Sequence, residues 1–333
     1  MSSNESAQAV TPPVARAKTT GLHNGAAVPG VAKVDPIIII DNVSRTFGGL
    51  KAVDVDHLEI PRGAITALIG PNGAGKTTLF NLLTGFDKPD SGTWTFDGTT
   101  LSGIPAFKVA RMGQVRTFQL TKALGLLTVL DNMKLGAKGQ GGERFWTGIF
   151  PFPFWRGQEE AIEERAIKLL KKFKLDAKME DYAASLSGGQ RKLLEMARAL
   201  MSEPKLVMLD EPMAGVNPAL TQSLLEHILD LKDEGMTVLF VEHDMHMVRH
   251  IADWVVVMAE GRVVAEGDPV AVMKDPAVID AYLGAHQELD LGVVTGRYTA
   301  EEADPTTDAS ASAVADAVAI EAEGTAEVDG DLK

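Results

Sequence analysis

The stretch that decides the fold is Gly70-Pro71-Asn72-Gly73-Ala74-Gly75-Lys76-Thr77-Thr78. It fits G-x-x-x-x-G-K-[ST] at every position, with the apolar run Ile65–Ile69 before it and leucines at helical spacing after it. Glycines let a backbone wrap closely around an anion, and the amides of such a loop and of the following helix start point at phosphate groups. The stretch therefore predicts a phosphate-binding loop in which Lys76 contacts the phosphates and the Thr77 hydroxyl ligates Mg²⁺. The alternative is a glycine turn that binds nothing, and the strand–loop–helix context disfavours it.

The composition bounds the class of protein. The chain has 333 residues, which suggests one to three domains. It has no cysteine, which excludes disulfides, thiol catalysis and cysteine-ligated zinc. No apolar run approaches the ~18 residues of a spanning helix, and the N-terminus lacks the apolar core of a signal peptide. We expect a protein that is soluble or peripheral to a larger assembly.

The net charge of −14 belongs mostly to one end of the chain. Residues 285–333 carry twelve Asp or Glu against one Arg and one Lys, so this segment holds −10 and the rest of the chain −4. The acidity therefore describes a tail rather than a binding site. It also argues against nucleic acid as a partner, because phosphate contacts need a basic face.

The middle of the chain alternates strands and helices. Residues 1–35 and 285–333 have few large apolar residues and are predicted to be disordered tails. Residues 36–284 form the predicted folded domain, which begins with the strand at Ile37–Ile40 and ends with a small helix near Gly284. The alternation predicts an α/β fold with a mostly parallel sheet covered on both faces. Ligands of such sheets bind at the carboxyl ends of the strands.

Two acidic residues follow a second buried strand. The apolar run Leu206–Leu209 ends in Asp210 and Glu211. Behind a phosphate loop, this order places one carboxylate near Mg²⁺, and the next polarises the attacking water. A solvated acidic turn is the alternative.

Three further motifs have both a plain and a functional interpretation. His243 closes a third strand and is suited to hydrogen-bond a γ-phosphate, although His246 and His250 at i, i+4 raise the alternative of a metal site. Gln119 is a neutral acceptor for Mg²⁺ or water, or an ordinary glutamine. Before a helix, a serine hydroxyl and glycine amides form a second anion cradle or an ordinary helix cap. This last motif consists of Ser187, Gly188, Gly189 and Gln190.

The order and spacing of these motifs resemble one family. GPNGAGKTT (70–78), Gln119, LSGGQ (186–190), LVMLDEP (206–212) and His243 resemble the nucleotide-binding subunits of ATP-binding cassette (ABC) transporters. The resemblance covers residues 37–284. It implies a P-loop NTPase (RecA-like) core, an antiparallel β-subdomain and a helical subdomain at about 120–203.

The resemblance also implies a role for each motif. Phe47 stacks on adenine, the phosphate loop holds ATP, and the metal ligands are Thr77, Gln119 and Asp210. Glu211 is the general base and His243 the switch histidine. Ser187 to Gln190 cap the nucleotide of an opposite subunit in a dimer that sandwiches two ATP.

Within this family, the chain looks like the branched-chain amino-acid importers of the LivG type, with urea and amide importers as relatives. The marks include FGGLKAV (47–53), Ala281–Gly284 and an aromatic insert, Phe145–Trp155. The insert is a lid of the helical subdomain or a dock for a membrane subunit. One departure is Asn217, where most ABC proteins have Asp in the loop after Asp210-Glu211.

The implied partners are two transmembrane permease subunits, a second ATP-binding subunit and an extracytoplasmic substrate-binding protein. The implied location is the cytoplasmic face of the membrane, and the implied cofactors are ATP and Mg²⁺. A soluble ABC ATPase of translation or repair is the competing class. It is disfavoured because the chain has one cassette and no sustained heptads between the phosphate loop and LSGGQ. A catalytically dead regulator is disfavoured because the catalytic motif residues are present.

Overall fold

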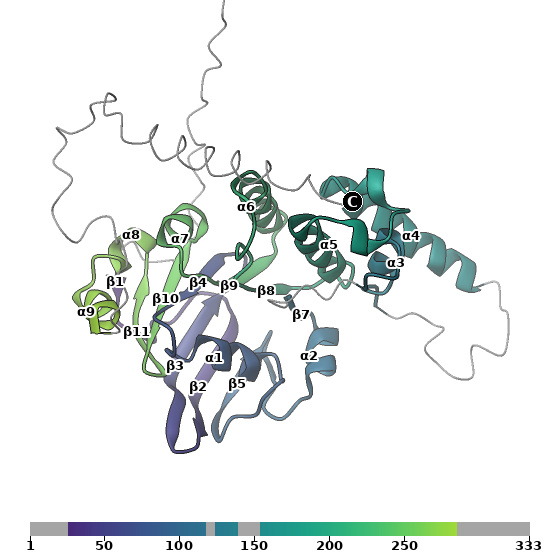
Figure 1. Cartoon of the computed structure of the whole chain (residues 1–333). Coiled ribbons are helices and arrows are strands. Elements are labelled where there is room, and N and C mark those ends of the chain that lie inside the picture. The colour runs from purple at the N-terminus through teal and green to yellow at the C-terminus, as the bar shows by residue number, and fades with distance from the viewer. Residues whose placement is uncertain (1–25, 118–123, 139–153, 285–333) are drawn as a thin grey trace, which may run out of the picture. The chain divides into compact units, whose positions relative to one another are not determined.

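The computed structural model describes residues 26–117, 124–138 and 154–284 (Figure 1). Gln119, both predicted tails beyond these limits and most of the aromatic insert lie outside the described residues. Within the three described ranges, no helix is long and apolar enough to cross a membrane.

A seven-stranded sheet forms the centre of the described chain, in the order β1-β11-β10-β4-β9-β8-β7. The strands from β10 to β7 in this order are parallel, and β11 and β1 add antiparallel pairs at one edge. Every residue of β4, β8 and β9 is buried, as expected of strands covered on both faces. The seven strands are β1 (Ala26–Ala27), β4 (Ile65–Ile69), β7 (Gln114–Thr117), β8 (Leu206–Asp210), β9 (Thr237–Val241), β10 (Trp254–Ala259) and β11 (Arg262–Gly267).

A second, antiparallel sheet has the order β3-β2-β5-β6. Its strands are β2 (Pro36–Phe47), β3 (Leu50–Pro61), β5 (Ser91–Phe96) and β6 (Thr99–Thr100). A two-residue turn joins β2 to β3, and both of its glycines have positive φ, 54° at Gly48 and 89° at Gly49. Phe47 is therefore the last residue of β2 and lies opposite Leu50 in the register of the two strands.

Nine α-helices connect and cover the strands in the described ranges. They are α1 (Lys76–Leu83), α2 (Ala106–Met112), α3 (Val129–Lys134), α4 (Phe154–Lys172), α5 (Gly188–Leu200), α6 (Pro218–Asp233), α7 (Met245–Ile251), α8 (Pro269–Val272) and α9 (Pro276–Gly284). Short 3₁₀ turns cover Asp176–Lys178 and Ala183–Ser185.

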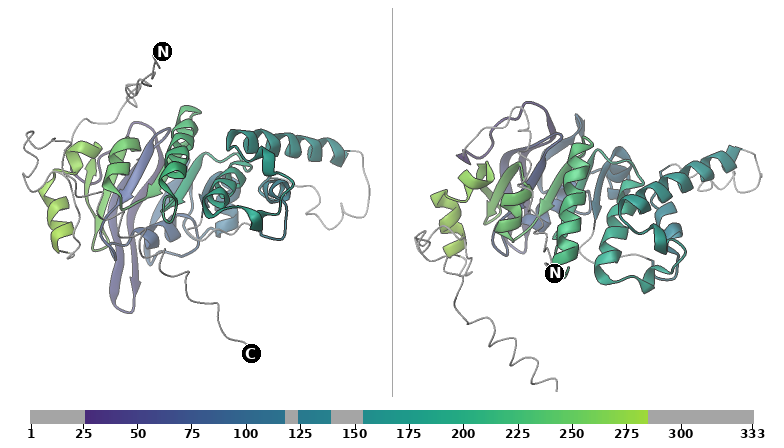
Figure 2. Two further views of the ribbon diagram at one scale, coloured as in Figure 1. Left: turned by 45° about the horizontal axis from the view of Figure 1, so that its top comes forward. Right: turned by 90° about the horizontal axis from the view of Figure 1, so that it is seen from above.

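Helices α3, α4 and α5 pack against one another, and α5 also contacts the edge strand β7. Figure 2 shows this group beside the β7 end of the main sheet. These helices fall within the segment that the sequence assigns to a helical subdomain. Ala166, Leu170 and Phe173 are fully buried, and their i, i+4, i+7 spacing is that of one face of an amphipathic helix.

The prediction of disorder up to Asp35 is wrong for residues 26–35. Strand β1 pairs with β11, and the ammonium of Lys33 donates to Glu266 Oε2 over 2.7 Å, with both side chains almost fully buried. Glu266 also accepts the backbone N–H groups of Gly30 and Val31 and the indole N–H of Trp254. Specific polar partners therefore hold this segment, whereas its Val28 and Val34 side chains are largely exposed.

Candidate nucleotide-binding site

The phosphate loop (residues 70–78) connects β4 to α1 as the sequence predicts. Gly70, Gly73 and Gly75 have φ of 149°, 81° and 98°. A Cβ on Gly70 would lie 2.1 Å from the Met258 carbonyl oxygen, and a Cβ on Gly75 would lie 2.2 Å from that of Ala52. Both positions therefore require glycine, for reasons of conformation and of space.

Lys76 is the first residue of α1, and its side chain turns back over the loop. Its ammonium donates to the carbonyl oxygens of Gly70 at 2.7 Å and Pro71 at 2.9 Å. Burial lowers the pKa of Lys76, and the negative charges of Glu211 and Asp210 oppose that shift. The Lys76 ammonium is thus held against the backbone of the loop and interacts electrostatically with both carboxylates.

Three predicted site segments meet at one edge of the sheet. The phosphate loop follows β4, Asp210 ends β8, and His243 comes shortly after β9, which lies between β4 and β8. Val241 is the register partner of both Leu68 and Asp210, so the strands end at one level. The parallel topology therefore brings together residues that are far apart in the sequence.

Asp210 is buried and paired with a cation. Arg116 Nη2 donates to Asp210 Oδ2 at 2.5 Å, and Nη1 of the same guanidinium donates to Asn81 Oδ1 at 2.6 Å. A carboxylate and the hydroxyl of Thr77, the second residue of α1, are hard oxygen donors of the kind that Mg²⁺ prefers. These two donors fit the predicted metal.

Glu211 has φ of 45°, in the left-handed region that non-glycine residues seldom adopt. Its backbone N–H donates to the Val241 carbonyl oxygen at 3.0 Å, which ties the residue to β9. The chain bends sharply here, directly after Asp210. Such outliers cluster at functional sites.

His243 is exposed, but the residue before it is not. Glu242 is 2% exposed, and its two carboxylate oxygens accept the backbone N–H groups of Met213 at 3.1 Å and His243 at 3.2 Å. Burial is the main cause that raises the pKa of the Glu242 carboxyl, and those two N–H groups oppose the shift. Glu242 thus joins the loop after β8 to the start of the His243 segment.

The alternative metal site at His243, His246 and His250 is not supported. Among the residues that the structure describes, no group of three or more His, Cys, Asp or Glu side chains could hold a metal ion. The i, i+4 spacing of His246 and His250 is that of an ordinary surface helix, since both side chains are exposed on α7.

The LSGGQ segment starts α5 with a capping box. Ser187 Oγ accepts the Gln190 N–H, and Gln190 Oε1 accepts the Ser187 N–H at 3.0 Å. The plain interpretation as a helix cap therefore holds within one copy. Lys192, one turn on, donates to the carbonyl oxygens of Pro212 and Ala214, so α5 is tied to the loop after Glu211.

Other predicted residues have distinct surroundings. Phe47 is 48% exposed, with the Arg45 guanidinium 4.6 Å from its ring centroid. The same hairpin approaches the phosphate loop, because Ala52 on β3 abuts Gly75. Asn217 caps α6 by accepting the Leu220 N–H at 2.9 Å, a task that the usual Asp would also perform.

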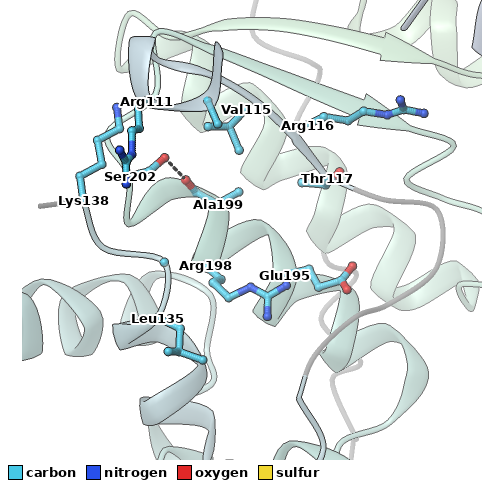
Figure 3. Close-up of a pocket in the computed structure, with 12 residues that line it drawn as sticks. Arg111, Val115, Arg116, Thr117, Leu135, Lys138, Glu195, Arg198, Ala199 and Ser202 are labelled. Atoms are coloured by element: carbon cyan, nitrogen blue, oxygen red, sulfur yellow. Dashed lines mark hydrogen bonds between the residues drawn. The ribbon is translucent and has the colours of Figure 1, made fainter. Parts of the chain in front are cut away.

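A groove of about 330 Å³ lies between α5 and the segments α2, β7 and the end of α3 (Figure 3). Its wall carries apolar Val115, Leu135 and Ala199 and basic Arg111 and Lys138. Leu135 is 54% exposed. The groove therefore presents both apolar and basic side chains to another molecule.

Three polar residues around the site were not predicted from the sequence, namely Arg116, Lys192 and Glu242. Their partners are distant in the chain; Arg116 and Asp210 are 94 positions apart. For Arg116 and Glu242 the available signal was a charge directly beside apolar strand residues, since a buried charge needs a partner, whereas Lys192 lies within α5 and gives no such signal. That signal marks the residue and does not identify the partner.

The family models and the relatives that match this chain all belong to the ABC transporters. The family described as ABC transporter matches residues 53–214, and the branched-chain amino acid ATP-binding cassette transporter family matches residues 262–288. A probable branched-chain amino acid transport ATP-binding protein LivG of Archaeoglobus fulgidus is 42% identical over 258 residues, covering 77% of this chain and 99% of that protein. The corresponding BraF of Pseudomonas aeruginosa is 40% identical, covering 75% and 98%.

Solved structures agree with the sequence relatives. A nucleotide-free ATP-binding cassette from an ABC transporter has a TM-score of 0.64 and 37% identity, covering 74% of this chain and 98% of that chain. The ADP conformation of an ABC-transporter cassette has a TM-score of 0.65 and 38% identity, covering 75% and 99%. The predicted α/β P-loop NTPase fold is confirmed, and the chain belongs to the ABC transporter ATP-binding family, in the group that contains LivG and BraF.

Proposed function

We propose that this chain is the ATP-hydrolysing subunit of an importer for branched-chain amino acids. The observation that carries the proposal is the convergence of the phosphate loop, Asp210-Glu211 and His243 at the carboxyl ends of β4, β8 and β9. The substrate class is supported by relatives of about 40% identity that are named for branched-chain amino acid transport.

Each residue has a proposed task. The loop amides and Lys76 bind the phosphates of ATP. Thr77, Asp210 and Gln119 would hold Mg²⁺, which supplies positive charge against the developing charge on the phosphates. Glu211 accepts a proton from the attacking water, and His243 hydrogen-bonds the γ-phosphate.

Phe47 is proposed to stack on the adenine, since its ring is half exposed at the end of β2. Ser187, Gly188, Gly189 and Gln190 are proposed to act on the nucleotide of a second ATP-binding subunit. The exposed start of α5 supports this role, because backbone amides at a helix N-terminus favour anions.

The partners follow from the transporter family. Importer subunits of this kind work with membrane permease subunits, and we place this chain at the cytoplasmic face beside two of them, served by an extracytoplasmic binding protein. The groove of Figure 3 is the proposed seat for a permease segment, because it combines exposed Leu135 with basic residues.

The test is uptake by proteoliposomes that contain this chain and its copurified permease subunits, with the extracytoplasmic binding protein supplied outside. Leucine uptake should require ATP inside and should be abolished by Lys76→Ala. Urea and a short amide serve as competing substrates. ATP-driven uptake of urea but not leucine would replace the substrate class. A chain that hydrolyses ATP but copurifies with no permease subunit would favour a soluble ATPase.

A further inference from the structure

Arg116 joins three elements around the predicted metal-binding carboxylate. It lies on β7, and its guanidinium donates to Asp210 Oδ2 at the end of β8 and to Asn81 Oδ1 on α1. The guanidinium carbon also lies 5.5 Å from the ring centroid of Phe80. In Figure 3 its side chain runs from β7 away from Arg111 and Lys138.

The pair with Asp210 is deeply buried. Its two side chains are 8% and 6% exposed for Arg116 and Asp210. The four residues that precede Asp210 are apolar and buried. A carboxylate in such surroundings is strongly disfavoured unless a cation and hydrogen bonds compensate it. Arg116 supplies both.

The second nearby cation is engaged elsewhere. The Lys76 ammonium donates to the carbonyl oxygens of Gly70 and Pro71, and Asp210 influences it electrostatically. Within the part of the chain that the structure describes, the direct ion pair of Asp210 is the one with Arg116. The Asp210 carboxylate is thus both the ion-pair partner of Arg116 and the proposed ligand of the Mg²⁺ that accompanies ATP.

We propose that Arg116 is a positioning residue that acts as an internal counter-ion of Asp210 and competes with Mg²⁺ for its carboxylate. This inference rests on the proposed function. Arg116 holds Asp210 oriented and neutralised while the site lacks metal, and it yields when Mg²⁺ arrives with the nucleotide. Arg116 thereby sets the concentration of Mg²⁺ at which the site fills.

The test measures equilibrium binding of a fluorescent ATP analogue as a function of free Mg²⁺, without turnover. In Arg116→Gln, Asp210 loses its competitor, so the Mg²⁺ midpoint should fall by roughly tenfold, the ratio that one charge-assisted hydrogen bond is worth. Arg116→Lys keeps a cation and should lie between this variant and wild type. It also carries the test if Arg116→Gln does not fold. A midpoint that is unchanged or raised in the folded variants overturns the proposal.

Melting temperatures separate competition from a purely structural role. In EDTA, Arg116→Gln should melt below wild type because Asp210 is left unpaired, and Mg²⁺ with the ATP analogue should restore much of the loss. The double variant Arg116→Gln with Asp210→Asn should regain stability in EDTA. An equal loss with and without Mg²⁺ and nucleotide would mean that Arg116 only packs, and would refute the competition.

Arg62→Gln is the matched control. Arg62 also pairs with an aspartate, Asp97, at 2.7 Å, but on the second sheet. It should leave the Mg²⁺ midpoint at the wild-type value. Failure of the wild type to bind the ATP analogue would refute the proposed function itself, whereas tight binding with an unchanged midpoint in the variants refutes only the inference about Arg116.

Discussion

At the scale of single residues, the position of the Glu211 carboxylate depends on an unusual backbone conformation. Its left-handed conformation would be costly in isolation, and it is held by the bond from the Glu211 N–H to Val241. The same bond lies beside Asp210, whose register partner is also Val241. Two carboxylates with different proposed tasks are therefore fixed by one strand pairing.

Glu211→Gln should keep ATP binding and reduce turnover by roughly 100-fold or more, because an amide cannot accept the proton of the attacking water. Phosphate release by the purified protein measures this. Glu260→Gln is a close control, since Glu260 is another glutamate of positive φ (48°) after a sheet strand, yet it is exposed and lies outside the proposed site. Turnover of Glu211→Gln near the wild-type rate would remove Glu211 from the role of base.

At the scale of elements, side chains tie the ends of neighbouring segments together. Lys192 joins α5 to the loop after β8, and Glu242 joins the same loop to the end of β9. Burial lowers the pKa of Lys192 and raises that of Glu242. The LSGGQ helix and the ends of β8 and β9 are thus connected through polar contacts as well as through packing.

The raised pKa of Glu242 predicts a pH dependence. As pH rises past the ordinary value of 4.5, the unfolded chain releases this proton first, so ionisation of Glu242 lowers stability until the pH exceeds the folded pKa. Glu242→Gln does not titrate. The free energy of unfolding of Glu242→Gln should therefore rise relative to that of wild type as pH increases through this window. The variant also loses one acceptor for a backbone N–H, and this loss lowers its stability by a constant amount.

Urea unfolding of both proteins between pH 4.5 and pH 8 measures the difference. The exposed Glu226 on α6 gives the control Glu226→Gln, which should show no such trend. A difference between wild type and Glu242→Gln that stays flat or changes in the opposite direction would contradict the prediction.

The groove beside α5 gives a second prediction at this scale. Leu135→Gln should weaken assembly with the permease subunits by roughly tenfold and leave basal ATPase activity intact, because an apolar contact in an interface core is lost. Copurification at a series of concentrations measures the affinity. Val270→Gln changes a residue of similar exposure (46%) on α8, outside the groove, and should assemble normally. Equal behaviour of the two variants would place the permease elsewhere.

At the scale of the whole molecule, contacts between distant parts of the chain fix the boundaries of the fold. Lys33 and Glu266 are 233 positions apart and form an almost fully buried ion pair. The same lysine lies 4.6 Å over the ring of Trp254. Residues 26–35 therefore belong to the folded domain through β10 and β11.

Lys33→Met should lower the free energy of unfolding by roughly 3–5 kcal/mol, because Glu266 is left as an uncompensated buried charge. Denaturant unfolding measures the change. Lys178→Met is the control, because Lys178 forms a partly exposed ion pair with Asp181 over 3.3 Å. Its loss should lower the free energy of unfolding by under about 1 kcal/mol. A loss of similar size in both variants would show that the Lys33 pair is no stronger than a surface contact.

The sequence by itself determined the features that are encoded locally. The phosphate loop and the buried strands at Ile65–Ile69 and around Leu206–Leu209 appear where the pattern predicts, because glycine spacing and apolar runs act over a few residues. The order of the motifs also predicted the family. Helix α2 was not predicted, since it is seven residues long and only Val109 among them is buried.

The tertiary structure alone decided which charges meet. Arg116 with Asp210, Lys192 with the loop after Glu211, and Lys33 with Glu266 are pairs that no local pattern contains. Their partners lie on other strands or on the loop after β8, and the strand order brings them within hydrogen-bond distance. A buried charge is stable only with such a partner, so the sequence shows that a partner is needed while the fold determines its identity.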